Sequence, residues 1–292
     1  MELTHLEKEL INRGYDENLV KELTSFDISY AYKVRDIVLE DITKGCTIKP
    51  DPKAIYIGGQ PGSGKTTLLR TIKNNWKKND VIPIIGLDNY RIYHPNYNKI
   101  EKAINEYWKD KEETKDSSRS NDIADFTSNF AGTVSDLIIE NITDKKYNIA
   151  IEWGMRKPEV PLATMEELKN KGYYNIVEFI VVDKYTSKEA CKIRDDILNK
   201  HDLILRRIPE YFHDDAISSL PSSAEQIFIE GYLNKKTIDE FKLIDRDGNI
   251  LWNNNSEEKL IDTYRYYLDK KQDNLKNNPE YGELSYLEET KK

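Results

Sequence analysis

One segment of the sequence has the composition of a phosphate-binding loop. It fills every fixed position of the pattern GxxxxGK[ST] with Gly59, Gln60, Pro61, Gly62, Ser63, Gly64, Lys65 and Thr66. An apolar run precedes it and a helical stretch follows, which is the context that such loops require. Glycines let backbone N–H groups surround phosphate oxygens, Lys65 adds a positive charge, and the Thr66 hydroxyl is placed to bind Mg²⁺. We expect residues 59–67, Thr67 included, to bind a purine nucleoside triphosphate.

The loop leaves open whether the phosphate passes to water or to an acceptor molecule, and two acidic residues bear on that choice. Asp88 ends an apolar run at 81–88, and Glu152 lies near the end of another at 147–153. Strand ends in open parallel sheets face the ligand crevice. Asp88 could hold Mg²⁺ through water, accept a proton from an acceptor hydroxyl, or simply cap a helix. Glu152 could assist a metal or a base, or hydrogen-bond a substrate.

Several arginines follow these runs. Arg156 lies in the turn after Glu152, Arg194 lies in "KIRDD", and Arg206 and Arg207 lie in "LILRRIPE". Phosphoryl transfer spreads negative charge over the equatorial oxygens, and arginines from a lid can neutralise it. Ordinary surface arginines are the alternative. The histidines lack metal-ligand spacing, and we expect His94 to stabilise a loop.

Short apolar runs alternate with long helical stretches along the middle of the chain. The runs are residues 54–58, 81–88, 147–153 and 175–183. This alternation is typical of a parallel sheet covered on both faces. Residues 241–252 carry two further β-like runs around Asp247-Gly248, a hairpin signal. We therefore predict an α/β fold of the P-loop kinase type, with a central, mostly parallel sheet flanked by helices.

The regions on either side of this core are predicted to be helical. Thr4 and Glu7 form a capping-box pattern, and Gly14 stands where the first helix should end. A charged segment at 108–122 is predicted to be an insertion. The predicted partition is a helical N-terminal leader packed on the core (1–50), the kinase core (51–255), and a C-terminal helix with a polar tail (256–292).

Composition limits the class of protein. The chain has 292 residues, a net charge of −8 and 33% charged residues. This acidic balance disfavours nucleic acid as a partner, because nucleic-acid binders need a clustered basic face. Cys46 and Cys191 have no motif spacing, so free thiols in a reducing compartment are expected. The sequence shows neither a secretory signal nor an apolar span of membrane length, which predicts a cytoplasmic protein.

Three segments together resemble one known family. The segments "GGQPGSGKT", "LDNYRIYHPNY" and "IEWGMRKPEVP", followed by "IRDD", "RR" and "FHDD", are similar to those of the zeta toxins, P-loop small-molecule kinases of bacterial toxin–antitoxin pairs. The resemblance runs from about residue 54 to about 252. Its most specific part is D-x-[FY]-[RK]-x-x-HP at residues 88–95.

The resemblance implies a reaction and partners. The reaction is phosphorylation of the sugar 3′-hydroxyl of UDP-N-acetylglucosamine or a related UDP-amino sugar, with ATP or GTP as donor and Mg²⁺, which blocks cell-wall synthesis. A small helical antitoxin is the implied protein partner. By position, Lys65 and Thr66 match the residues that bind nucleotide phosphates and Mg²⁺, and Asp88 matches the catalytic base.

The resemblance also assigns the remaining site residues. Glu152 and Arg156 match residues that hold the sugar nucleotide, and Thr164 matches a nearby substrate-binding threonine. Arg194 and Arg207 match two arginines that clamp the phosphates in the transition state. The pair His213-Asp214 fits the family pattern without an assigned role.

One departure bears on the acceptor. Where the family commonly has E-G-T-x-R, this chain has Glu152-Trp153-Gly154-Met155-Arg156, so the hydroxyl after the glutamate is missing and a Trp ring is present that could stack on a base or sugar. Two alternatives therefore stay open. One is a kinase of the same fold that acts on a nucleoside, an antibiotic or a nucleic-acid end. The other is an NTP-hydrolysing regulatory module.

Overall fold

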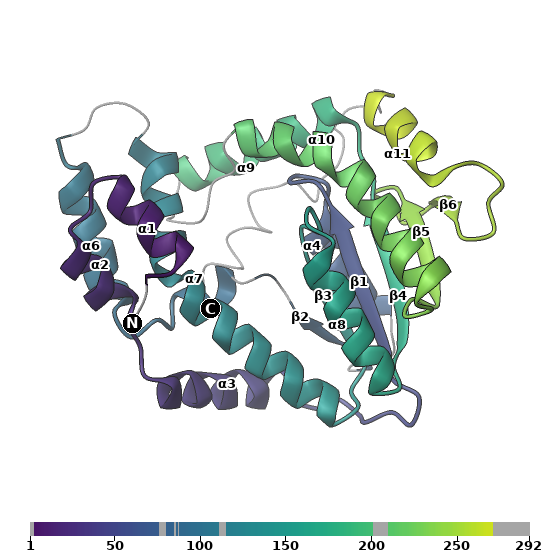
Figure 1. Ribbon diagram of the computed structural model, residues 1–292, viewed down its shortest axis with the longest axis horizontal. Coiled ribbons are helices and arrows are strands. Elements are labelled where there is room, and N and C mark those ends of the chain that lie inside the picture. Colours follow the sequence, from purple (N-terminus) through teal and green to yellow (C-terminus); the bar gives the residue numbers. More distant parts are fainter. Residues whose placement is uncertain are drawn as a thin grey trace. The chain divides into compact units, whose positions relative to one another are not determined.

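The computed structural model describes residues 3–75, 80–84, 86, 88–110, 115–200 and 210–270. Contacts divide the chain into two units. The helical unit is drawn from residues 1–44 and 86–141, and the sheet unit from residues 45–85, 142–203 and 208–292. Figure 1 labels most of the elements of both units.

The described residues of the sheet unit include a sheet of six strands. They are β1 (Lys53–Gly59), β2 (Ile82–Ile84), β3 (Ile149–Glu152), β4 (Tyr174–Ile180), β5 (Glu240–Ile244) and β6 (Ile250–Asn253). Their spatial order is β2-β3-β1-β4-β5-β6. The first five run parallel, and β6 pairs antiparallel with β5. The predicted α/β fold, with its mostly parallel sheet and closing hairpin, is confirmed.

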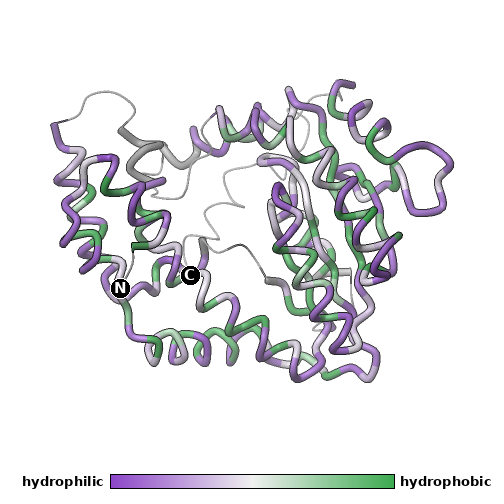
Figure 2. Tube along the Cα trace, in the orientation of Figure 1, coloured by the Kyte–Doolittle hydropathy of each residue, from purple (hydrophilic) through white to green (hydrophobic). Residues whose placement is uncertain are grey.

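Apolar runs form these strands because helices cover both faces of the sheet. Leu69 and Ile72 of α4 (Lys65–Asn75) pack against Ile55 and Ile57 of β1 on one face. The other face contacts α8 (Glu159–Asn170) and the π-helical segment η1 (Phe228–Asn234). In Figure 2 the strands are mainly coloured as hydrophobic, as expected for buried central strands.

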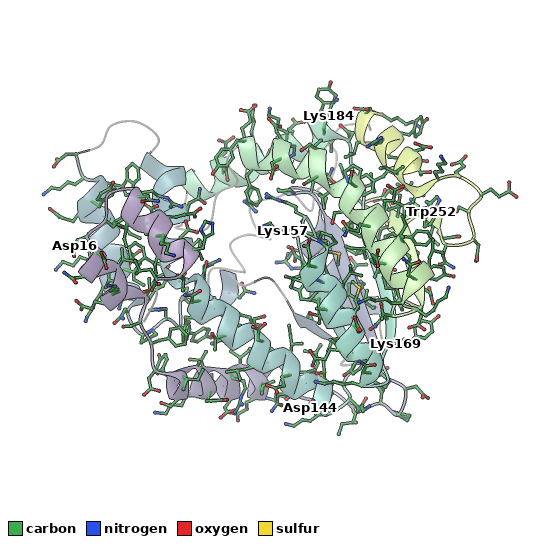
Figure 3. The ribbon with its side chains drawn as sticks, in the orientation of Figure 1. Asp16, Asp144, Lys157, Lys169, Lys184 and Trp252 are labelled. Atoms are coloured by element: carbon green, nitrogen blue, oxygen red, sulfur yellow. The ribbon has the colours of Figure 1, made fainter. Side chains whose placement is uncertain are left out.

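The described part of the sheet unit also contains α9 (Lys184–Lys200), α10 (Glu210–Ile227) and α11 (Leu260–Asp269). Contacts join α10 to both α9 and α11. Helix α11 lies within the predicted C-terminal region, whereas residues 271–292 lie outside the described residues. Figure 3 labels Lys157, just before α8, and Lys169, in the last turn of that helix.

The helical unit contains α1 (His5–Asn12), α2 (Glu17–Thr24), α3 (Ile28–Ile42), α5 (Asp88–Arg91), α6 (Tyr97–Trp108) and most of α7 (Lys115–Asp144). The predicted capping box is present, because Thr4 accepts from the Glu7 amide and the Glu7 carboxylate accepts from the Thr4 amide. Leu10 and Val20 share a hydrophobic core with Ile104 and Phe126. The first helices therefore pack with the segment that follows β2 in the chain.

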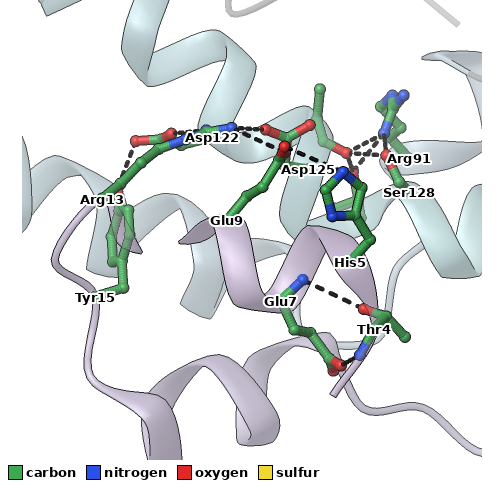
Figure 4. Close-up of polar contacts among 12 residues, drawn as sticks. Thr4, His5, Glu7, Glu9, Arg13, Tyr15, Arg91, Asp122, Asp125 and Ser128 are labelled. Atoms are coloured by element: carbon green, nitrogen blue, oxygen red, sulfur yellow. Dashed lines mark hydrogen bonds and ion pairs between the residues drawn. The ribbon is translucent and has the colours of Figure 1, made fainter. Parts of the chain in front are cut away.

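A buried carboxylate ties these helices together (Figure 4). Asp122, which is 1% exposed, pairs with the Arg13 guanidinium at 2.6 Å. It also accepts hydrogen bonds from the Tyr15 hydroxyl at 2.6 Å and the Trp108 indole N–H at 2.7 Å. A buried carboxylate needs such partners to offset its lost hydration. The C-terminal end of the predicted charged insertion thus contributes to a core.

The predicted domain boundaries at residues 50 and 255 remain predictions. Among the helices that the structure describes, none has the length and apolar content needed to cross a membrane.

Candidate active site

The predicted phosphate-binding loop joins β1 to α4 in the sheet unit. Strand β1 ends at Gly59 and α4 begins at Lys65, so backbone N–H groups of the first helical turn are directed at the loop. Gly62 has φ +73°, and a Cβ at this position would overlap the carbonyl oxygen of Ser187. Only glycine fits both the left-handed backbone and the close approach of α9.

The Lys65 ammonium lies inside this loop. Its Nζ donates to the carbonyl oxygens of Gly59 and Gln60, both at 3.0 Å. Burial lowers the pKa of Lys65, and the nearby Glu152 carboxylate opposes that lowering. The loop therefore holds a positive charge that is partly shielded from water, which strengthens its attraction for phosphate.

Thr66, in the first turn of α4, meets Glu152 at the end of β3. Ile57 of β1 pairs with Glu152 of β3 in the parallel ladder, and the Thr66 hydroxyl donates to Glu152 Oε2 at 2.9 Å. The chain thus places a hydroxyl and a carboxylate side by side next to the loop. Both offer the hard oxygen ligands that Mg²⁺ prefers.

The donor set suits Mg²⁺ bound jointly by protein and substrate. The described residues contain no group of three or more His, Cys, Asp or Glu side chains that could hold a metal ion. Mg²⁺ usually keeps several waters and uses one or two protein ligands together with substrate phosphates. Thr66 and Glu152 fit that pattern, with Thr66 as the predicted ligand.

Helix α9 contributes charge from the other side of the loop. Its N-terminus is capped by Asp183, whose Oδ1 accepts from the amides of Tyr185 and Thr186 at 3.1 and 2.9 Å. Arg194, further along this helix, lies close enough to Lys65 to contribute to the lowering of its pKa. Arg194 therefore acts electrostatically on Lys65, and the phosphate-binding roles of both residues remain predictions.

Burial raises the pKa of the Cys191 thiol on the same helix, while the Arg194 charge lowers it. This thiol is buried, and a Cβ on Gly62 would lie 3.0 Å from its sulfur. We assign Cys191 to the packing of α9 against the loop, in agreement with a free, unreactive cysteine.

The predicted acceptor residues lie on and after β3. Arg156 pairs with Asp215 at 2.7 Å. The Trp153 ring lies 6.0 Å from that of Tyr56, between centroids. The Thr164 hydroxyl donates to the Val160 carbonyl within α8, at 3.3 Å. Glu152 thus ends β3, Arg156 lies in the turn that follows, and Thr164 lies in the next helix.

Two predicted catalytic residues are not described at the level of the side chain. Asp88 begins α5 in the helical unit, and its side chain lies outside the described residues. Arg207, like Arg206, lies outside them as well. Their roles remain predictions. His94 is buried, its Nδ1 accepts from the Asn96 amide at 3.1 Å, and burial lowers its pKa to about 4.

Two contacts to the loop were not anticipated from the sequence. Arg246 donates through Nη2 to the Gly62 carbonyl from the β5–β6 hairpin, and Gln60 donates through Nε2 to the Val182 carbonyl after β4. Arg246 follows a strand parallel to β1, so the carboxyl ends of both strands lie at one edge of the sheet. A basic residue just after the last parallel strand is the signal that could have identified it.

Comparison with solved structures supports the fold. A chain from the PezAT chromosomal toxin–antitoxin system of the human pathogen Streptococcus pneumoniae superposes with a TM-score of 0.69. The match covers 86% of this chain and 91% of that chain, at 22% sequence identity.

Comparison of sequences identifies the family. Toxin PezT of Streptococcus pneumoniae is 30% identical over 65% of this chain and 68% of its own length. Toxin zeta of Enterococcus hirae is 27% identical over 72% of this chain, and the match spans 66% of that relative's length. The zeta toxin family model matches residues 36–257, most of the chain. The chain therefore belongs to the zeta toxin family.

Proposed function

We propose that this protein is a kinase that transfers the terminal phosphate of ATP or GTP to the sugar 3′-hydroxyl of UDP-N-acetylglucosamine or a related UDP-amino sugar. The observation that carries the proposal is the loop itself, in which Lys65 is enclosed by loop carbonyls and Thr66 is joined to Glu152 at the neighbouring strand end. Membership of the zeta toxin family supports it.

On the donor side, backbone N–H groups, Lys65 and Arg194 neutralise the charge of the triphosphate. Thr66 would ligate Mg²⁺, which supplies further charge neutralisation at the transferred phosphate. We propose that Arg207 supplies a second positive charge, next to the phosphate that is transferred. Because phosphoryl transfer requires positioning and charge stabilisation more than covalent chemistry, these groups supply the main catalytic contribution.

On the acceptor side, we assign Asp88 as the general base that accepts the proton of the attacking hydroxyl. Glu152, Arg156 and Thr164 are proposed to hold the UDP-sugar. The Trp153 ring, in place of the small residues common in the family, is proposed to pack on the sugar or the base.

We further propose that the protein acts in the cytoplasm as a toxin restrained by a small helical antitoxin. The relative of similar fold belongs to a toxin–antitoxin system, and PezT is itself a toxin. Phosphorylation of a cell-wall precursor would then block wall synthesis.

The test is incubation with UDP-N-acetylglucosamine, Mg²⁺ and either ATP or GTP, followed by mass spectrometry for one added phosphate. Lys65→Ala should abolish the product, whereas Lys192→Ala, at an exposed position of α9, should not. Product from nucleosides or oligonucleotides alone would reassign the acceptor. Steady hydrolysis without any phosphorylated product would indicate a regulatory module instead.

A further inference from the structure

The first turns of α10 carry the "FHDD" segment, for which the sequence suggested no role. Two of its side chains contact Arg156. Asp215 Oδ2 lies 2.7 Å from Arg156 Nη2, and the Phe212 ring lies 4.2 Å below the guanidinium carbon. The guanidinium is therefore fixed in two directions, since the ion pair sets its edge and the ring sets its plane.

The other terminal nitrogen of this guanidinium, Nη1, can still donate a hydrogen bond to a ligand. Arg156 Nη1 is buried and makes no hydrogen bond to the described residues. A buried N–H group without an acceptor is costly, so such a group in a candidate active site indicates a place for a ligand oxygen. Arginine favours anionic oxygens, phosphate above all.

A second contact from α10 fixes the backbone just before Arg156. The Ser223 hydroxyl donates to the Met155 carbonyl at 2.6 Å, and both residues are buried. Met155 has φ +49°, a left-handed conformation that an unbranched side chain adopts at some cost. Helix α10 thus holds the turn after β3 at both the main chain and the Arg156 side chain.

We propose that Asp215, with Phe212, is a positioning residue that aims Arg156 Nη1 at an anionic group of the acceptor, a nucleoside diphosphate in chemical class. This inference rests on the proposed function for the identity of the acceptor. The ion pair between Asp215 and Arg156 adds little to the stability of the fold, because Asp215 is 57% exposed and exposed ion pairs contribute little free energy.

The test uses the full chain and compares the KM values for acceptor and donor in UDP-N-acetylglucosamine phosphorylation. Asp215→Ala should raise the acceptor KM about tenfold, because a charge-assisted contact orients Arg156. The donor KM and the melting temperature should stay unchanged. Asp215→Asn, which keeps an acceptor oxygen, should restore part of the loss. Glu225→Gln, ten residues further along α10, is the matched control and should change neither KM.

A double-variant cycle measures whether the effect of Asp215 on the acceptor KM depends on Arg156. In an Arg156→Ala background, Asp215→Ala should have no further effect, since its role passes through Arg156. An unchanged acceptor KM in Asp215→Ala, an equal rise in both KM values, or full additivity with Arg156→Ala would overturn the inference.

Calorimetry separates this inference from the proposed function. With a non-hydrolysable ATP analogue bound, UDP alone should bind the wild type and should bind Asp215→Ala about tenfold more weakly. If no UDP-sugar is phosphorylated but UDP binding depends on Asp215, the proposed function fails and the positioning role stands. If UDP does not bind the wild type, the positioning role fails too.

Discussion

The phosphate loop and the turn after β3 lie at the ends of two paired strands, yet they are held in different ways. The loop is held largely through its own backbone, with glycine at the tightest points and carbonyl groups folded around Lys65. The turn is held by side chains of α10, which arrive some sixty residues later in the chain. A local backbone requirement leaves a motif in the sequence, whereas a long-range side-chain contact leaves none.

Two adjacent glycines illustrate the contrast. Gly59 is the first residue of the loop motif. Gly58, just before it, lies outside the motif, and a Cβ there would lie 2.8 Å from the Met155 sulfur. Gly58 therefore makes room for the turn after β3, while Gly59 serves the loop. Of these two neighbouring glycines, Gly58 is thus required by the packing of the turn after β3 and Gly59 by the backbone of the phosphate loop.

The largest effect is expected from Gly62→Ala. The new methyl group would meet the Ser187 carbonyl, and the φ of +73° disfavours any side chain. We expect ATP to bind at least about 100-fold more weakly, a loss of about 2.7 kcal/mol. Calorimetry with a non-hydrolysable ATP analogue measures it, with Gly154→Ala as the control because a Cβ there has open space. Near-wild-type affinity for Gly62→Ala would contradict the claim that α9 closes on the loop.

Arg246→Ala should give the next largest effect. It should weaken the binding of the donor nucleotide and leave the binding of the acceptor unchanged. The variant removes a charged hydrogen bond to the Gly62 carbonyl, and such bonds contribute about 1.5–3 kcal/mol. We expect the affinity for ATP to fall about tenfold or more, while UDP binding stays unchanged. The control is Arg265→Ala, at an exposed position of α11. An equal loss of UDP affinity would show that the hairpin supports both sides of the site.

The same contrast explains how much could be predicted from the sequence. Buried strands read as apolar runs, so the sheet and its closing hairpin were predicted and are confirmed. The loop residues were predicted because their spacing is fixed by phosphate geometry. The structure then places Thr66, Glu152 and Arg194 near that loop, and their catalytic or binding roles remain proposals.

Arg246 and Asp215 were missed for one physical reason. Each acts through a contact between segments far apart in the chain, and a single charged residue in a hairpin or a helix is usually a solvated surface group. The sequence predicts a helical leader packed on residues 51–255 without saying that α6 and α7 share its core, because an amphipathic helix shows which face is buried but not what covers it.

Gly58→Ala should have a smaller effect, on the acceptor side. The added methyl group must displace the Met155 sulfur, the end of a flexible side chain, and also meets the Phe179 ring. Overpacking of this kind costs about 1–3 kcal/mol, so we expect the acceptor KM to rise several-fold and the melting temperature to fall. The double variant with Met155→Ala should recover part of both losses, because it frees the space. A double variant worse than either single one would refute the account of Gly58.

The smallest effect concerns His213, which joins the two regions. It lies on α10, but its Nε2 is 2.9 Å from the Ser187 hydroxyl of α9. Burial lowers the pKa of His213, and Asp214 partly opposes this lowering. Because the unfolded chain then takes up a proton at a higher pH than the folded one, the free energy of unfolding should fall as the pH drops below about 6.5.

His213→Gln should flatten this acid dependence, since glutamine keeps a polar partner for Ser187 without titrating. Melting temperatures between pH 7.5 and 5 measure the slope. His94, whose pKa burial lowers to about 4, contributes a similar slope in both proteins, so only the difference between them reports on His213. If the difference is accompanied by weaker ATP binding at low pH and by unchanged UDP binding, His213 belongs to the donor side, through Ser187. Equal slopes in the wild type and His213→Gln would show that protonation of this ring does not affect the packing of α9 on α10.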